Sequence, residues 1–206
     1  MRARSQSIVT NLVDADLRHA AIALVALLIV VGAYHRIRSQ MSGESLDRTR
    51  EGWPLLIGIR LASLAGGGLV VMVLRDPVGS WAYLHIPVSI RWFGIAGLAA
   101  SVAWLSWMFV SLGRNLTDTV VARRAAVLVE VGPYRFIRNP MYTGLLAMGV
   151  SLGVALGTWV IAAAFSVQFV LLALRTAREE QHLIARFGDQ YRDYMNRVGR
   201  FLPRIG

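Results

Sequence analysis

Long apolar segments are the feature that most constrains the fold of this chain. Residues 17–34, 54–74 and 88–112 form three runs with few charged side chains. Each is close to the roughly 20 residues that a helix needs to cross about 30 Å of hydrocarbon. The composition agrees, because 17% of the residues are charged, whereas soluble domains hold about 25%. We therefore predict an all-α integral membrane protein.

A fourth apolar run, at residues 142–174, is too long for one ordinary span. Gly157-Thr158-Trp159 interrupts it, and such a break favours two helices joined by a tight turn. The prediction is therefore about five transmembrane helices, of which the last two form a C-terminal helical hairpin. A cleaved signal peptide is the competing interpretation of the first run, but Asp14 and Asp16 precede it, which is atypical of such a leader.

Glycines inside two of the runs predict close helix packing. Gly149, Gly153 and Gly157 recur every four residues and so share one helix face. The second run carries glycine at each of positions 66–68, where small residues would let a neighbouring helix approach.

The arginines indicate how the chain is oriented. Twelve of them lie in two polar segments that flank the hairpin, residues 113–141 and 175–206. If the hairpin returns, both segments lie on one face, which the positive-inside rule places in the cytoplasm together with the C-terminus. The N-terminus then lies outside. The formal charge of +10 indicates anionic membrane lipids rather than nucleic acid, because the basic residues lie between apolar spans.

The chain offers little for metal chemistry. It contains no cysteine, which excludes thiolate ligands and cysteine nucleophiles. Its four histidines are scattered without ligand spacing. No metal site is predicted.

The segment before the hairpin is rich in turn formers and hydrogen-bonding side chains. Gly132-Pro133 marks a turn, and Pro140 opens the next helix. The free N–H groups of that helix start can hold a carboxylate or phosphate. The side chains of Tyr134, Asn139 and Tyr142 could close around an adenine or ribose. The alternative is ordinary interfacial tyrosine, with arginines paired to lipid phosphates.

Charged residues follow the hairpin directly. Arg175 and Glu179 are four residues apart, so they are neighbours on one helix face. The simplest interpretation is an ion pair at a helix end, but at the membrane boundary these groups would be partly desolvated and could hold a ligand charge. Further on, an apolar face among arginines predicts a segment that lies on the membrane surface; its members are Tyr191, Tyr194, Val198, Phe201 and Leu202.

Together these motifs resemble the isoprenylcysteine carboxyl methyltransferase family and the related phospholipid methyltransferases. The resemblance covers residues 112–204, so the chain divides into N-terminal spans (1–112) and a methyltransferase core (113–206). The matching elements, in order, are Leu128-Val129, Gly132-Pro133-Tyr134, Arg138-Asn139-Pro140-Met141-Tyr142-Thr143-Gly144, Arg175, Glu179-Glu180, Phe187-Gly188-Asp189-Gln190-Tyr191 and Arg197-Val198 to Pro203.

The resemblance implies an S-adenosylmethionine-dependent enzyme with a cytoplasmic cofactor site and a lipophilic acceptor. By position, Arg175 falls where the family orients the acceptor carboxylate. The cofactor-binding positions are Ala126, Val127, Leu128, Val129, Tyr134, Asn139, Pro140, Met141, Tyr142 and Glu179. Family members often carry histidine where Ala126 and Asn139 stand. The Asn139 amide can still donate a hydrogen bond to a carboxylate, but it cannot take up a proton as an imidazole does.

The acceptor stays open at this point. Carboxyl O-methylation of an isoprenylcysteine-like or other lipid substrate is the leading prediction. N-methylation of a phospholipid amine would need a proton sink, for which Glu179 and Glu180 are candidates. Two further alternatives are a sterol-reductase-like membrane oxidoreductase that binds a nicotinamide cofactor, and a lipid-binding membrane protein without catalysis.

Overall fold

The computed structural model describes residues 2–40, 53–75, 79–112 and 128–204. Within these residues the chain is all-helical, with no strand beyond two isolated bridges. The helices are α1 (Arg2–Gln40), α2 (Trp53–Arg75), α3 (Val88–Leu112), α4 (Pro140–Leu156), α5 (Trp159–Phe187) and α6 (Asp189–Arg197). Two short 3-10 turns, η1 (Ser80–Ala82) and η3 (Gly132–Arg135), lie between them.

Four of these helices are long and apolar enough to cross a membrane, which makes the chain a multi-pass membrane protein. They are α1, α2, α3 and α5, whose candidate membrane spans are Asp14–Ser39, Ile57–Arg75, Val88–Leu112 and Trp159–Phe187. The helix α4 is also apolar but has 17 residues. The predicted all-helical membrane fold is confirmed, and each predicted run coincides with a helix.

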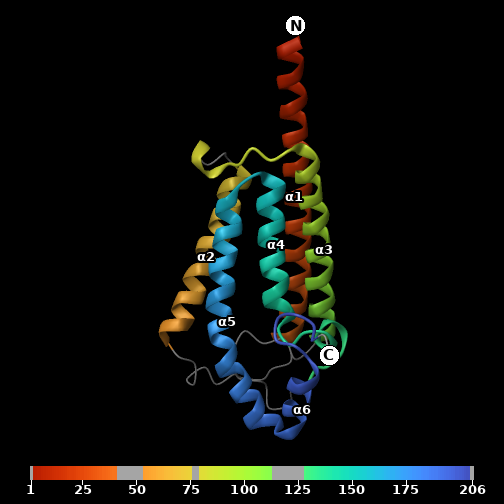
Figure 1. Cartoon of the computed structure of the whole chain (residues 1–206), viewed down its shortest axis with the longest axis vertical. Helices are drawn as coiled ribbons and strands as arrows, with labels where there is room; N and C mark the ends of the chain where they lie inside the picture. The colour runs from red at the N-terminus through yellow and green to blue at the C-terminus, as the bar shows by residue number, and fades with distance from the viewer. Residues whose placement is uncertain (1, 41–52, 76–78, 113–127, 205–206) are drawn as a thin grey trace.

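The helices form an upright bundle (Figure 1). α3 packs against both α1 and α4, α4 packs against α5, and α2 packs against α5. The turn between α4 and α5 lies at the same end of the bundle as η1, while α6 and the C-terminus lie at the other end. We call these the closed end and the open end of the hairpin.

The turn of the hairpin falls where the sequence predicted it. Gly157 has φ 70° and ends α4 in the left-handed conformation, which glycine adopts without steric cost. Thr158 is extended, and its N–H donates to the carbonyl of Gly153 at 2.8 Å. Two neighbouring residues thus reverse the chain, and α5 begins at Trp159.

The glycine predictions have a mixed outcome. A side chain at Gly149 would collide with Phe165 of α5, and one at Gly153 would meet Thr158 and Ala162, so these two positions do allow close packing of the hairpin. Gly157 serves the turn instead. The prediction for the second span is wrong for the described residues, because nothing lies within 4 Å of the position that a side chain would take at residues 66, 67 and 68.

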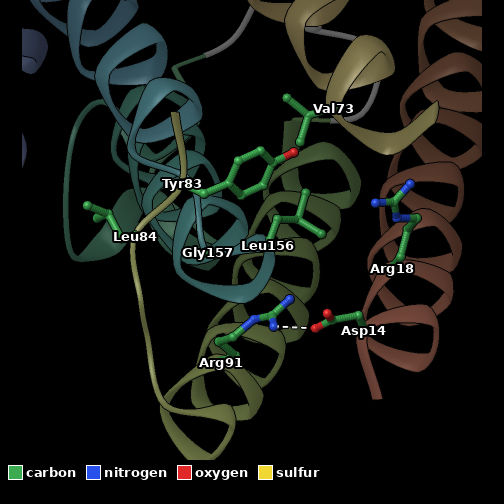
Figure 2. A pocket seen from close by; sticks show the side chains of 8 residues that line it. All are labelled: Asp14, Arg18, Val73, Tyr83, Leu84, Arg91, Leu156 and Gly157. Atoms are coloured by element: carbon green, nitrogen blue, oxygen red, sulfur yellow. Dashed lines mark hydrogen bonds and ion pairs between the residues drawn. The ribbon is translucent and has the colours of Figure 1, made fainter. Parts of the chain in front are cut away.

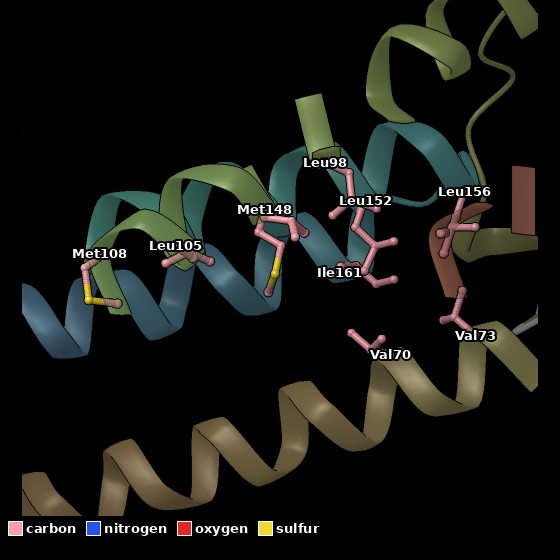
Figure 3. Packing of buried hydrophobic residues seen from close by; sticks show 11 residues of the cluster. Val70, Val73, Leu98, Leu105, Met108, Met148, Leu152, Leu156 and Ile161 are labelled. Carbon is pink, nitrogen blue, oxygen red and sulfur yellow. The ribbon is translucent and has the colours of Figure 1, made fainter. Parts of the chain in front are cut away.

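The main apolar core is formed by residues of all five long helices, α1 to α5, and Figure 3 shows its buried members. Leu98, Leu105, Leu152 and Ile161 are almost completely buried there. Large exposed side chains such as Phe93 (76% exposed) are distributed over the outward faces of the long helices, as expected where lipid replaces water as the solvent.

Candidate active site

A cluster of polar side chains lies at the open end, where the start of α4 meets the second half of α5. Tyr142 is in the first turn of α4 and is 4% exposed. Its hydroxyl lies 2.7 Å and 2.8 Å from the two carboxylate oxygens of Glu179. These residues are 37 positions apart in the chain, and the hairpin brings them together because α4 and α5 are antiparallel neighbours.

The Glu179 carboxylate also forms an ion pair within α5. Arg175 Nε lies 3.1 Å from Glu179 Oε1, and the two side chains are 11% and 18% exposed. The sequence predicted both this pair and its partial desolvation at the membrane boundary, and the low exposure agrees with that prediction. A pair removed from water in this way interacts more strongly than the exposed surface pairs that contribute about 0.2–1 kcal/mol.

Tyr134, in η3, completes this side of the cluster. Burial, followed by the negative charge of Glu179, raises the pKa of Tyr134 well above its usual value. The phenol therefore stays protonated at physiological pH and keeps its proton for donation. Its backbone is held in place by Tyr194 of α6, whose hydroxyl donates to the Tyr134 carbonyl at 2.6 Å.

Glu180, which the sequence offered only as a candidate proton sink, forms a second buried network that the sequence did not predict. Its side chain is 6% exposed, and Arg138 donates to it from Nη2 at 2.8 Å and from Nε at 3.1 Å. Arg200 donates to the same carboxylate from Nε, at 3.2 Å, and from Nη2. The turn before α4 and the C-terminal segment therefore converge on one carboxylate of α5.

The network fastens the C-terminal segment against the turn before α4. The N–H groups of Arg138 and Asn139 donate to the carbonyls of Gly199 and Arg200, at 2.8 Å and 3.1 Å. The Asn139 amide adds a contact of 3.3 Å to the Arg200 carbonyl. Trp104 of α3 also donates to the Pro140 carbonyl at 3.0 Å. The start of α4 is thus held by both α3 and the C-terminal segment.

The structure therefore brings most of the predicted site residues to one end. Tyr134, Tyr142, Arg175 and Glu179 form the cluster, and Asn139 and Pro140 lead directly into it. Met141 packs into the apolar clusters beside Tyr142.

The extended segment before η3 is described only in part. Leu128 packs against the buried cluster that Tyr191 and Tyr194 form, and Val129, the next residue in the chain, is half-buried. Ala126 and Val127 lie outside the described residues.

The predicted membrane-surface face of the C-terminal segment needs correction. Tyr191, Tyr194 and Val198 are buried at 3%, 2% and 6% exposure, and they pack against Leu128 and the end of α5. Their apolar character serves packing within the protein. Leu202, in contrast, is 74% exposed.

The family comparison agrees with this arrangement. A family model described as phospholipid methyltransferase matches residues 89–190, about half of the chain, from α3 to the start of α6. The chain belongs to this family of membrane methyltransferases, which includes the isoprenylcysteine carboxyl methyltransferases. Family members depend on S-adenosylmethionine, so the chain is an S-adenosylmethionine-dependent methyltransferase.

Curated relatives include proteins with different names. The nickel-cobalt-cadmium resistance protein NccN of Alcaligenes xylosoxydans xylosoxydans is 27% identical, with 72% of this chain and 75% of the relative covered. Protein-S-isoprenylcysteine O-methyltransferase of Schizosaccharomyces pombe is 27% identical, with 81% and 74% covered. Methanethiol S-methyltransferase 2 of Bradyrhizobium diazoefficiens is 30% identical, with 61% and 54% covered.

A solved structure shares the fold. It is that of the eukaryotic intramembrane Ras methyltransferase, an isoprenylcysteine carboxyl methyltransferase, with a TM-score of 0.53 and 19% sequence identity. The similarity covers 90% of this chain and 68% of that one. At this identity the likeness concerns the fold alone.

Proposed function

We propose that the chain methylates the carboxylate of a lipophilic acceptor, such as an isoprenylcysteine-like lipid, at the open end of the hairpin. The observation that supports this most is the buried cluster of Tyr142, Glu179 and Arg175, which combines a carboxylate and a guanidinium at the boundary of the apolar bundle. A polar cofactor would reach this end from water, and the acceptor from the bilayer.

The residues present fit the cofactor's charges. S-adenosylmethionine supplies, when bound, a methyl group on a positively charged sulfur. The Glu179 carboxylate would accept hydrogen bonds from an ammonium or ribose hydroxyl, and Tyr134 would donate one. The first turn of α4 begins at Pro140, which has no N–H, and the N–H groups of Met141 and Tyr142 that follow favour an anionic group. Leu128, Val129 and Asn139 would complete the walls of the binding site.

Arg175 is our candidate for holding the acceptor. A guanidinium binds a carboxylate with two parallel hydrogen bonds, which fixes orientation as well as charge. Methyl transfer to a carboxylate requires alignment more than proton transfer, because the acceptor is already a nucleophile. Arg175 would therefore act by orienting the acceptor.

The glutamates at the open end already have partners, and this favours a carboxylate as methyl acceptor over an amine or a thiol. At the open end of the described chain, Glu130 pairs with Arg197, Glu179 with Arg175 and Tyr142, and Glu180 with two arginines. These partners already donate hydrogen bonds to oxygens of all three carboxylates, which an acceptor's proton would otherwise reach. An amine or thiol acceptor has a proton to lose, whereas a carboxylate has none.

We further propose that α4 also crosses the membrane, which gives five spans in total. In the proposed orientation the open end and the C-terminus face the cytoplasm. The 17 residues of α4 extend about 25 Å, close to the thickness of the hydrocarbon. Residues 113–206 form the methyltransferase core in this proposal, and residues 1–112 supply three spans. A reporter active only outside the cytoplasm, fused to the C-terminus, should give no signal; an active reporter would reverse the orientation.

Two experiments test the activity. Titration calorimetry of the purified chain in detergent should show binding of S-adenosylmethionine; binding of a nicotinamide dinucleotide instead would favour a reductase. Membranes incubated with methyl-labelled S-adenosylmethionine should then yield a base-labile labelled lipid, because methyl esters hydrolyse in base. A base-stable label on an amine or sulfur would contradict carboxyl methylation.

A further inference from the structure

The closed end of the hairpin contains a cavity of about 270 Å³ (Figure 2). Asp14 and Arg18 of α1 and Arg91 of α3 line its polar side, and Val73 and Leu156 line its apolar side. Gly157, at the hairpin turn, also borders it. Tyr142 lies about 22 Å away along α4, at 1.5 Å per residue. The cavity is therefore distinct from the proposed methyl-transfer site.

Hydrogen bonds from several elements hold the cavity walls in place. Arg91 forms an ion pair with Asp14 at 2.5 Å, and its Nε donates to the Ala155 carbonyl at 3.0 Å. The loop after η1 is fastened to the hairpin turn, where the Leu84 N–H donates to the Gly157 carbonyl at 2.8 Å. Contacts that join α1, α3, α4 and this loop indicate a preformed cavity.

Two charged groups on the wall have unused hydrogen-bonding capacity. Arg18 donates from Nη1 to the carbonyls of Leu74 and Arg75, at 3.4 Å and 3.3 Å, and its Nε and Nη2 have no partner among the described residues. The Asp14 carboxylate uses Oδ1 for Arg91, and its Oδ2 likewise has no partner in the described part of the chain. Asp14 and Arg18 are four residues apart and face the cavity from the same side of α1 (Figure 2).

This pairing selects a particular ligand chemistry. A purely anionic ligand would satisfy Arg18 but would leave Asp14 Oδ2 without a donor, because Arg91 occupies only Oδ1. A purely cationic ligand would be repelled by Arg18 and Arg91. An anionic group on Arg18 and an ammonium on Asp14 would satisfy both. We propose that this cavity binds a zwitterionic aminoalkyl phosphate, with the phosphate on Arg18 and the ammonium on Asp14.

The position of the cavity indicates where such a ligand comes from. Trp81 and Trp159 lie at the same end, with ring centroids 5.9 Å apart, and they are 66% and 44% exposed. Exposed tryptophans at the ends of spans mark the interface between membrane and water. Phospholipid headgroups are concentrated at that depth, and a free aminoalkyl phosphate in the adjacent water has the same chemistry.

Native mass spectrometry of the delipidated full chain tests the proposal. The probes are dioleoylphosphatidylethanolamine, dioleoylphosphatidylglycerol, which lacks the ammonium, and dioleoylglycerol, which lacks the phosphate. We expect phosphatidylethanolamine to be retained about tenfold better than phosphatidylglycerol, and dioleoylglycerol not to be retained. Excess free phosphoethanolamine separates the two sources: if it displaces the lipid, the headgroup alone suffices, and if it does not, the ligand is the lipid.

Variants link the binding to the cavity. Asp14→Asn should remove the preference for phosphatidylethanolamine, and Arg18→Gln should weaken retention of both phospholipids. The matched control is Asp16→Asn, because Asp16 is an exposed carboxylate on the same helix that does not line the cavity. Equal retention of the two phospholipids by the unmodified chain, or equal behaviour of the Asp14 and Asp16 variants, overturns the proposal. Should Arg18→Gln fail to fold, the comparison of the two aspartate variants decides.

Discussion

Both ends of the helical hairpin hold arginine–carboxylate pairs, but they differ in how far water is excluded. At the open end, Arg138 and Glu180 are 8% and 6% exposed. At the closed end, Arg91 and Asp14 are 16% and 45% exposed. Because Coulomb interactions strengthen as water is removed, and unpaired charges become more costly, equivalent substitutions should have unequal effects at the two ends.

The two ends also differ in which segments they join. At the closed end the contacts join α1, α3, α4 and the loop after η1, with one ion pair between Arg91 and Asp14. At the open end two arginines, from the turn before α4 and from the C-terminal segment, share the carboxylate of Glu180. Because that one buried carboxylate holds both segments at the proposed site, its loss should disturb ligand binding and folding together.

The largest expected effect is on folding. Glu180→Ala would leave Arg138 buried without its counter-charge, and the free energy of unfolding should fall by about 3–5 kcal/mol. Arg200 contributes less to this loss, because its side chain is 43% exposed. Unfolding in detergent measures the effect. Asp189→Ala, which breaks an exposed ion pair with Arg192, is the control and should cost less than about 0.5 kcal/mol. Similar losses for the two variants would remove the contrast between buried and exposed pairs.

The next effect is on cofactor affinity. Glu179→Ala should weaken binding of S-adenosylmethionine about ten- to a hundredfold, because a charge-assisted hydrogen bond contributes roughly 1.5–3 kcal/mol. Glu179→Gln keeps an acceptor oxygen for Tyr142, so its affinity for S-adenosylmethionine should lie between that of the unmodified chain and that of Glu179→Ala. Calorimetric titration of both variants gives the comparison. An unchanged dissociation constant for Glu179→Ala would exclude this carboxylate from the cofactor site.

A third substitution separates acceptor binding from cofactor binding. Arg175→Ala should slow turnover about tenfold, since the acceptor would lose its alignment. It should change cofactor affinity less than Glu179→Ala does. Lysine at this position should restore part of the rate, because it keeps the charge without the two-pronged geometry. Turnover and cofactor affinity are measured for both variants; equal, small changes in the two quantities would leave Arg175 with only an ion-pairing role.

The smallest effect is expected at the closed end. Arg91→Gln removes the ion pair with Asp14 but keeps hydrogen-bonding capacity near Ala155, so unfolding free energy should fall by about 1 kcal/mol. Turnover should stay unchanged, because the site lies at the other end of α4. The same unfolding experiment and a methyl-transfer assay check both expectations. A loss as large as that of Glu180→Ala would show that partial exposure does not weaken this pair.

Local sequence patterns were sufficient for the helices. Apolar runs of spanning length predicted α1, α2, α3 and the hairpin, because a helix in lipid satisfies its own backbone hydrogen bonds and needs no distant partner. The turn at Gly157 was equally local, since a left-handed residue depends on its own backbone freedom. The hairpin also placed Tyr142 and Glu179 on one face of the membrane, but the hydrogen bonds between them are known only from the structure.

Only the tertiary structure decided which charges meet and which apolar faces are buried. Glu180 stands beside Glu179 in the chain, yet about 100° of helical rotation per residue directs it to different partners, Arg138 and Arg200. Tyr191 and Tyr194 have the spacing of a membrane-surface helix, but Leu128 and the end of α5 cover them instead. Periodicity shows that a face is apolar, and the neighbour that covers it depends on where the chain returns in space.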